Sequence, residues 1–185
     1  GRVDLPLNKT GVRQAKALAL NMRGWQIATI YTSPLRRALE TANILSKQLG
    51  LAIKPLDGLI DIDFGSWQGL FAEEAAKQDS ELYNRWLECP HQVHFPQGEG
   101  LEEVRQRVVA AVEKIAAEHD GQTVILVSHK VVCQVLICAL LGLDNSHFWQ
   151  VRQDVCALNA FQVSDGVPVV TLVNDTCYLK SLATR

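Results

Sequence analysis

Apolar and polar positions follow two different periods along the chain, and the alternation between them predicts an α/β fold. Apolar residues recur at helical spacing between Ala38 and Leu49 and again, as one face of a longer helix, between Leu101 and Ile115. Residues 123–127 are apolar without interruption, which is typical of a strand covered on both faces of a parallel sheet. The chain therefore contains both helices and buried strands.

The remaining segments extend this alternation over the whole chain. The predicted elements are a helix capped by Asn8 or Thr10 and running to about Met22, a strand at 28–32, a helix from Pro34 to a stop at Gly50, a short strand at 52–55, the long helix, the strand at 123–127, a buried helix at 131–141, and two strands at 157–163 and 167–173 joined by a hairpin-like turn at 164–166. Residues 58–96 are less regular, with helices near 73–78 and 80–87, and we interpret them as an excursion from the sheet. This order predicts a single domain over residues 1–185, folded as a three-layer α/β/α sandwich with a mostly parallel sheet, in which ligands bind at the carboxyl ends of the strands.

Composition limits the partners that the chain can have. Its 185 residues, 48% hydrophobic and 21% charged, are typical of a globular domain. A formal net charge of −2 gives no basic field for nucleic acid or an anionic membrane surface, and the apolar run at 135–141 is far shorter than the roughly 20 residues that span a bilayer. Five scattered cysteines and an opening stretch without a secretory pattern favour reduced thiols and a cytoplasmic location. The oligomeric state stays open, although apolar Val169, Val170 and Leu172 could lie at a sheet edge and allow a homodimer.

Two strand ends run through polar residues into the amino end of a helix. One is at 31–38, which contains Arg37, and the other is at 127–131, which contains His129. Helix amino termini attract anions, an arginine offers a planar fork of donors to phosphate oxygens, and a histidine at a strand end can face a pocket. Each residue alone also fits an ordinary interpretation, a solvated helix face for Arg37 and a loop residue for His129. Their joint placement at the strand ends of one sheet favours an anion site.

Five segments keep the order and spacing of one known family. They are Asp4 to Ala15 (DLPLNKTGVRQA), Thr32 to Ala42 (TSPLRRALETA), Leu59 to Gly69 (LIDIDFGSWQG), Pro96 to Glu99 (PQGE) and Val127 to His129 (VSH). Across essentially the whole chain they resemble the histidine phosphatase superfamily, in its phosphoglycerate mutase-like branch 1. The resemblance implies the phosphoglycerate mutase-like fold.

The resemblance also implies a reaction through a phosphorylated histidine. In the family, the histidine of an Arg-His-Gly loop attacks phosphorus, while arginines and a second histidine surround the phosphoryl oxygens. By position, Arg37 resembles one of these phosphate-binding arginines, and His129 resembles the second histidine, which is both catalytic and phosphate-binding. A catalytic carboxylate donates a proton to the leaving alcohol; its position is held by Asp61, with Asp63 as the alternative. No metal or organic cofactor is implied, because the histidine itself carries the phosphoryl group.

The chain departs from the family pattern at the nucleophile. No Arg-His-Gly occurs between Gly1 and Arg185, and the resemblance places that loop upstream of Gly1, together with a first strand in the middle of the sheet. We therefore expect two unpaired strand edges, and no phosphatase turnover from a chain that starts at Gly1. Asp61 also stands where the family usually has glutamate, which shortens the reach of the carboxyl group by one methylene.

The expected activity is that of a phosphomonoester hydrolase acting on a small phosphorylated metabolite. A phosphoglycerate mutase is one alternative, but in the family the mutases have a longer excursion with more basic residues, and the only cations at 58–96 are Lys77 and Arg85. The other alternative is a non-catalytic domain that keeps Arg37 and His129 as an anion pocket.

Overall fold

A parallel three-stranded sheet lies at the centre of the computed structural model, which describes residues 1–164 and 166–182. Its strands are β1 (Thr29–Thr32), β2 (Ile53–Pro55) and β3 (Val124–Val127), in the order β2–β1–β3. Ile30 of β1 is opposite Ile53 on one side and Ile125 on the other. All four residues of β1 are buried, as expected for the middle strand of a sheet covered on both faces.

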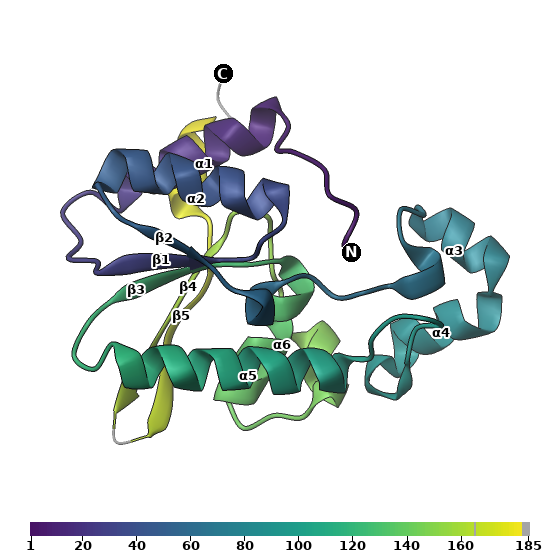
Figure 1. The fold of residues 1–185 in the computed structure, drawn as a ribbon. Helices are drawn as coiled ribbons and strands as arrows, with labels where there is room; N and C mark the ends of the chain where they lie inside the picture. The colour runs from purple at the N-terminus through teal and green to yellow at the C-terminus, as the bar shows by residue number, and fades with distance from the viewer. Residues whose placement is uncertain (165, 183–185) are drawn as a thin grey trace.

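Two pairs of helices cover the two faces of this sheet (Figure 1). On one face lie α1 (Lys9–Asn21) and α2 (Arg36–Leu49), and on the other lie α5 (Leu101–Glu118) and α6 (Lys130–Leu140). The predicted three-layer α/β/α sandwich with a parallel sheet is thereby confirmed. Leu101, Val104, Val108, Val112 and Ile115 form the buried face of α5, as their spacing predicted.

The helix ends follow from individual residues. The side chain of Asn8 caps α1 by accepting a hydrogen bond of 2.8 Å from the amide of Gly11. Gly50 ends α2 in the left-handed conformation, with a φ of 72° that glycine adopts without strain. The prediction that α2 begins at Pro34 is wrong by two residues, because Leu35 is still extended and its amide bonds to the Ser33 hydroxyl instead.

The last two strands form a separate sheet. β4 (Leu158–Ser164) and β5 (Val167–Asp175) pair antiparallel with each other, and within the described residues they pair with no strand of the central sheet. The predicted hairpin-like turn between them includes Asp165, which lies outside the described residues. As a result β2 and β3 in the central sheet, and β4 and β5 in the second sheet, each have one edge without a strand partner in the described part of the chain.

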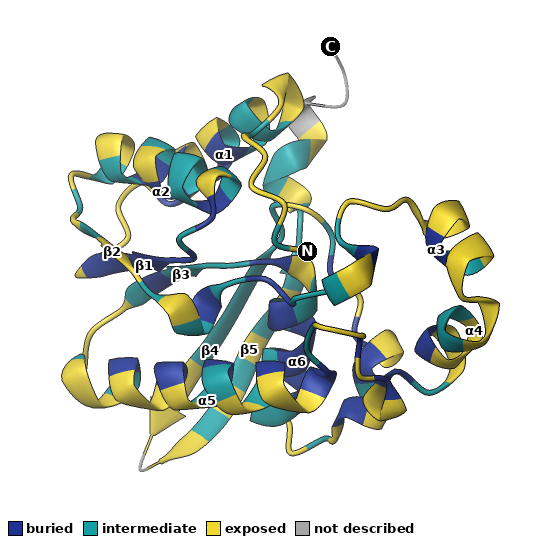
Figure 2. Ribbon diagram, turned by 45° about the vertical axis from the view of Figure 1, so that its right-hand side comes forward, coloured by how far each residue is buried: buried dark blue, intermediate teal, exposed yellow. Residues whose placement is uncertain are grey.

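The predicted excursion projects from one end of the sandwich (Figure 1). Its elements are η1 (Asp57–Leu59), η2 (Gly65–Trp67), α3 (Ala72–Gln78), α4 (Ser80–Glu88) and η3 (Pro90–Gln92). Figure 2 shows that α3 and α4 are mostly exposed, with buried positions on the sides that face the body.

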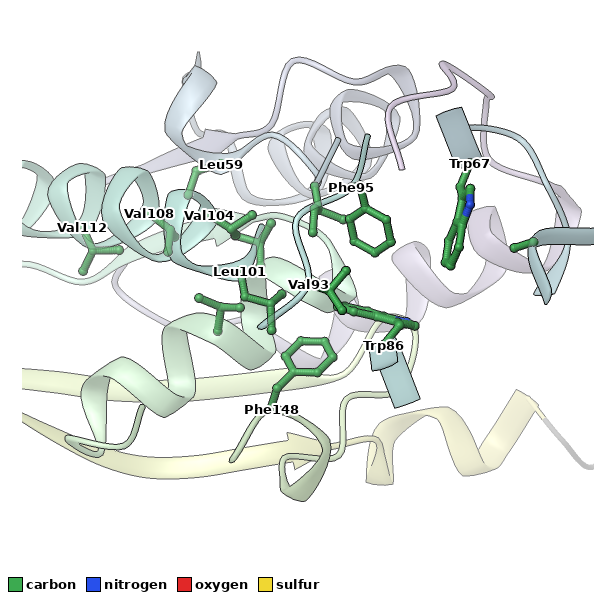
Figure 3. Close-up of a cluster of buried hydrophobic side chains, with 14 of the residues drawn as sticks. Leu59, Trp67, Trp86, Val93, Phe95, Leu101, Val104, Val108, Val112 and Phe148 are labelled. Carbon is green, nitrogen blue, oxygen red and sulfur yellow. The ribbon is translucent and has the colours of Figure 1, made fainter. Parts of the chain in front are cut away.

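An aromatic cluster attaches the excursion to the body (Figure 3). The ring of Trp86 on α4 lies 5.2 Å from that of Phe95 and 5.4 Å from that of Phe148, centroid to centroid. Phe148 belongs to η4 (Asn145–Gln150), a helix that the sequence patterns did not predict. The indole of Trp149 contacts Trp86 at 5.4 Å between centroids and donates a hydrogen bond of 2.9 Å to its carbonyl oxygen. Trp67 also contacts Phe95, at 5.2 Å, so both tryptophans of the excursion pack in the core.

No helix in the described part of the chain combines the length and apolar character that a membrane crossing requires.

Candidate active site

Arg37, Asp61 and His129, which are distant in the sequence, meet at the carboxyl end of the central sheet. Nη2 of Arg37 lies 2.9 Å from Oδ2 of Asp61, and Nδ1 of His129 lies 3.6 Å from the same oxygen. Asp61 and His129 are buried, with 7% and 8% of their surface exposed, while the Arg37 side chain keeps 26%. The three predicted site residues therefore meet at Oδ2 of Asp61, and the partly exposed Arg37 side chain connects this group to solvent.

Each side chain is positioned by the element that carries it. Arg37 is in the first turn of α2, the helix that follows β1, and Asp61 lies two residues after η1 in a segment without regular secondary structure. His129 is the extended residue directly before α6, and its side chain contacts Asp61 and Ser33. The neighbouring Ser128 donates a hydrogen bond of 2.8 Å to the carbonyl of Leu59, which ties the end of β3 to the segment that leads to Asp61.

The segment at 1–7 closes one side of the site. The guanidinium of Arg37 donates to the carbonyl oxygens of Val3 and Gly1 at 2.9 and 2.6 Å, and the backbone nitrogen of Gly1 lies 2.9 Å from Oδ2 of Asp61. Between this segment and the body is a hollow of about 290 Å³, lined by Gly1, Val3, Leu5, Arg37, Asp61 and Gln68. The hollow leads from solvent to the Arg37–Asp61 pair.

The amino terminus of α2 is already occupied by a carboxylate of the chain itself. The amide of Arg36 donates a hydrogen bond of 2.6 Å to Oδ1 of Asp4, and the amide of Leu7 donates to Glu40 at 2.8 Å. The bond from Leu7 and the pairing with Arg36 lower the pKa of Glu40. The Arg36 amide at this helix end is therefore bonded to the chain itself, and the cationic group that faces the site is the guanidinium of Arg37.

A network that the sequence patterns did not reveal holds the backbone around Asp61. Arg107 on α5 donates to the carbonyl oxygens of Ile60, Gly58 and Asp61 at 2.6, 3.1 and 3.2 Å, and pairs with Glu99 at 3.1 Å. Glu99 was part of a family segment, but nothing in the spacing of α5 distinguished Arg107 from its solvated neighbours.

Arg2 also belongs to this network. Its Nε donates to the Asp61 carbonyl at 3.0 Å, and its Nη2 lies 2.7 Å from Glu99. The Asp61 carbonyl thus accepts hydrogen bonds from two guanidinium groups, Arg2 and Arg107. These two bonds hold the backbone of Asp61 in place and thereby position its carboxylate.

Asp63 has a different environment. Its carboxylate accepts hydrogen bonds from the amide of Gly65 at 2.8 Å and from the side chain of Gln68 at 2.9 Å, and lies 3.4 Å from Arg2. The bond from Gln68, followed by the bond from Gly65, lowers the pKa of Asp63. These contacts hold Asp63 against η2, whereas Asp61 is the carboxylate that the structure brings to Arg37 and His129.

His129 is held by a second hydrogen bond and by burial. Its Nε2 lies 2.7 Å from the hydroxyl oxygen of Ser33, a residue with no exposed surface. Burial lowers the pKa of His129 to about 4; the charge of Asp61 opposes this shift, and the charge of Arg37 adds to it. The imidazole is therefore neutral at pH 7.

The other four histidines lie elsewhere in the described structure. His94 pairs with Glu103 at 2.8 Å, His147 with Asp144 at 3.1 Å, and His119 lies 3.0 Å from the Tyr31 hydroxyl, while His91 contacts Gln92. Within the described ranges, no three histidine, cysteine, aspartate or glutamate side chains are grouped to hold a metal ion.

The group around Asp61 offers a guanidinium, a carboxylate and a neutral imidazole to a ligand, a set suited to a phosphoryl group.

Comparison with known proteins gives consistent matches over nearly the whole chain. The model of the histidine phosphatase superfamily (branch 1) matches residues 1–176. Phosphoserine phosphatase 1 of Hydrogenobacter thermophilus is 36% identical over 179 residues, which cover 97% of this chain and 85% of that protein. Bifunctional protein Rv2228c of Mycobacterium tuberculosis is 36% identical over 182 residues, 97% of this chain, and the chain spans half of its length. The solved structure of Bacillus stearothermophilus YhfR has a TM-score of 0.92 and 29% identity, with 96% of this chain and 88% of that chain covered.

Proposed function

The chain belongs to the histidine phosphatase superfamily (branch 1). On this basis we propose that the protein is a phosphatase that hydrolyses a small phosphomonoester through a phosphohistidine intermediate. The observation that carries the proposal is the convergence of Arg37, Asp61 and His129 on one point. Arg37 and His129 are proposed to bind the phosphoryl oxygens, and Asp61 to act as the proton donor and acceptor.

The proposed reaction consists of two displacements. In the first, a nitrogen of the nucleophilic histidine bonds to phosphorus, the bond from phosphorus to the ester oxygen breaks, and the Asp61 carboxyl gives its proton to the departing alcohol. In the second, water attacks phosphorus and passes its proton to the Asp61 carboxylate, and the phosphorus–nitrogen bond breaks. The products are the alcohol, inorganic phosphate and the regenerated histidine.

The nucleophilic histidine is proposed to reside upstream of Gly1. The sequence from Gly1 to Arg185 holds no Arg-His-Gly, and His129 is engaged with Ser33. Two observations support the upstream position: the backbone nitrogen of Gly1 lies 2.9 Å from Asp61, so a preceding residue would stand beside the site, and β3 and β4 each offer an unpaired edge to a further strand.

The substrate is proposed to be a small phosphorylated metabolite, with phosphoserine as the first compound to test, since phosphoserine phosphatase 1 is a relative. Lys77 and Arg85, the cations of the excursion, are exposed residues of α3 and α4 and make no contact with Arg37, Asp61 or His129. The residues that line the hollow next to the site carry one cation, Arg37. Such a site suits a single phosphoryl group better than the two phosphoryl groups of a bisphosphorylated sugar acid.

The proposal is tested by comparing the chain from Gly1 to Arg185 with the same chain extended upstream to its start codon. The extended protein should hydrolyse p-nitrophenyl phosphate and phosphoserine and form an acid-labile phosphoprotein, while the chain from Gly1 should do neither. Interconversion of phosphoglycerates by the extended protein would instead favour a mutase. Phosphate binding without any turnover by the extended protein would favour a non-catalytic anion-binding domain.

Two further parts of the proposal concern the protein's surroundings. All five cysteines are free, which supports a cytoplasmic location. Of the three residues predicted at a sheet edge, Val169 is exposed on β5, whereas Val170 and Leu172 are half-buried. Val167 and Val173 extend the exposed apolar face around Val169, and a homodimer would cover it. Sedimentation of the extended protein at several concentrations tests the dimer, and a constant monomer mass would exclude it.

A further inference from the structure

We propose that Ser33 is a positioning residue that fixes His129 as the neutral tautomer with its proton on Nδ1, so that the histidine meets the phosphoryl group as an uncharged donor. The inference rests on the proposed function and deepens it by assigning the charge and the proton position of one phosphate-binding group. It starts from a pair separated by 96 residues in the sequence: the Ser33 hydroxyl and Nε2 of His129, 2.7 Å apart.

The direction of this hydrogen bond follows from the other partner of the hydroxyl. The amide of Leu35 lies 3.2 Å from Oγ of Ser33, and an amide can only donate, so the oxygen is the acceptor in that bond. The hydroxyl proton of Ser33 then needs an acceptor of its own, because the residue has no exposed surface. The one acceptor in contact with this hydroxyl within the described structure is Nε2 of His129, which therefore carries no proton.

The imidazolium form would conflict with the same geometry. Both ring nitrogens would then donate, Oγ of Ser33 would accept from His129 and from Leu35 together, and its own proton would be buried without a partner. An unsatisfied buried polar group costs about 1–3 kcal/mol. The charge of an imidazolium would also lie beside Arg37 in a buried position, although Asp61 would offset part of that repulsion.

The remaining proton of His129 is directed toward the reacting group. Nδ1 lies 3.6 Å from Oδ2 of Asp61, which is longer than a normal hydrogen bond and leaves this N–H available to a phosphoryl oxygen. The charged groups that act on the ring are Asp61, Arg37, the amino group of Gly1 and Arg107. Cys133, one turn further along α6, is a neutral neighbour, because burial raises the pKa of its thiol to about 12. The positive charge of the site is thus supplied by guanidinium groups, and His129 contributes a directed donor.

Nitrogen-15 NMR of the protein labelled at histidine tests the tautomer directly. The long-range correlation pattern of His129, assigned by its loss in His129→Gln, should be that of the Nδ1–H tautomer and should stay so from about pH 8 to about pH 5.5, below the usual range of histidine titration. A pattern of the Nε2–H tautomer, or a titration of His129 near pH 6.5, would overturn the proposal. This measurement needs no turnover, so its result is independent of whether the protein proves to be a phosphatase.

Substitutions separate the positioning role from a general structural one. Ser33→Ala should produce a mixture of tautomers at His129, while Ser128→Ala should leave the pattern unchanged, since that neighbouring hydroxyl donates to the Leu59 carbonyl. In the extended, active protein, Ser33→Ala should lower kcat about tenfold to a hundredfold with a smaller change in KM, and Ser33→Thr, which keeps the hydroxyl, should recover part of the loss. If Ser33→Ala leaves the Nδ1–H pattern intact in a folded protein, Ser33 does not set the tautomer and the proposal is wrong.

Discussion

Arg37 and Asp61 form an ion pair at the point where the β1 and β3 ends meet the excursion, with 2.9 Å between Nη2 and Oδ2. An incoming phosphoryl group brings further negative charge to the same guanidinium, so the carboxylate and the ligand compete for it.

Asp61→Asn should strengthen the binding of inorganic phosphate while it lowers turnover. Removing the carboxylate charge frees Arg37 for the ligand, and we expect an affinity gain of about threefold to tenfold, which corresponds to about 0.7–1.4 kcal/mol. Loss of the proton donor should lower kcat about 10²-fold to 10⁴-fold. Calorimetric titration with phosphate and steady-state kinetics of the extended protein measure the two effects.

The matched control for this variant is Asp57→Asn. Asp57 is an exposed residue of η1, four positions before Asp61, so the substitution removes the same charge without changing the ion pair. Weaker phosphate binding by Asp61→Asn than by the control would show that the carboxylate assists binding and does not compete with it.

Arg37→Lys should weaken phosphate binding by about tenfold or more, because a lysine ammonium cannot reproduce the planar fork of donors. In the structure that fork already serves the Val3 carbonyl and Asp61 at the same time. Arg36→Lys is the matched control, since Arg36 is 60% exposed at its side chain and pairs with Glu40. Equal losses in the two variants would contradict the assignment of Arg37 to the site.

His129 should make the protein less stable as the pH falls. Its pKa is lowered from 6.5 to about 4 in the folded state, so between these values the unfolded chain binds a proton that the folded chain does not. The free energy of unfolding should therefore drop from about pH 6.5 to about pH 4, by at most about 3 kcal/mol from this residue. Urea titrations of wild type and His129→Gln across this range isolate the contribution, which should be absent from the variant. Parallel pH curves for the two proteins would mean that His129 titrates normally.

Arg107→Gln should destabilise the fold and disturb the site together. Arg107 contacts three carbonyl oxygens and Glu99, all of them partly buried. Without the guanidinium these acceptors lose their charged hydrogen-bond donor. We expect a loss of about 2–4 kcal/mol in the free energy of unfolding, with kcat falling more than the affinity for phosphate. Arg105→Gln, on the same helix, removes a single bond of 2.7 Å to the Leu143 carbonyl and should cost about 1 kcal/mol. A loss no larger than that of Arg105→Gln would show that the network is dispensable.

The pattern of apolar positions was sufficient for the layers and for most element boundaries, because burial on one helix face or on both faces of a strand leaves a local periodicity. It also placed Arg37 and His129 at strand ends of one sheet. The start of α2 was misplaced because the hydroxyl of Ser33, three residues before the helix, accepts a hydrogen bond from the Leu35 amide, which the position of Pro34 alone does not reveal.

Contacts between distant segments were beyond the reach of these patterns. Arg107 meets carbonyl oxygens that are 46 to 49 residues away, and Asp4 caps a helix that starts 32 residues later. Nothing in the local sequence distinguishes these side chains from solvated ones, since any arginine or aspartate on an exposed face has the same neighbours. Phe148 likewise joins the aromatic cluster from a short helix without apolar periodicity.

The contact between Trp86 and Trp149 provides a spectroscopic probe for the docking of the excursion. The two indoles are 5.4 Å apart and inclined at 73°, close enough for their electronic transitions to couple into an exciton signal in circular dichroism. One ring belongs to the excursion and the other to η4, so the coupled band exists only while the excursion is docked. Heating followed at that band and at the helical amide band would show whether the excursion separates before the sandwich melts, without any added chromophore.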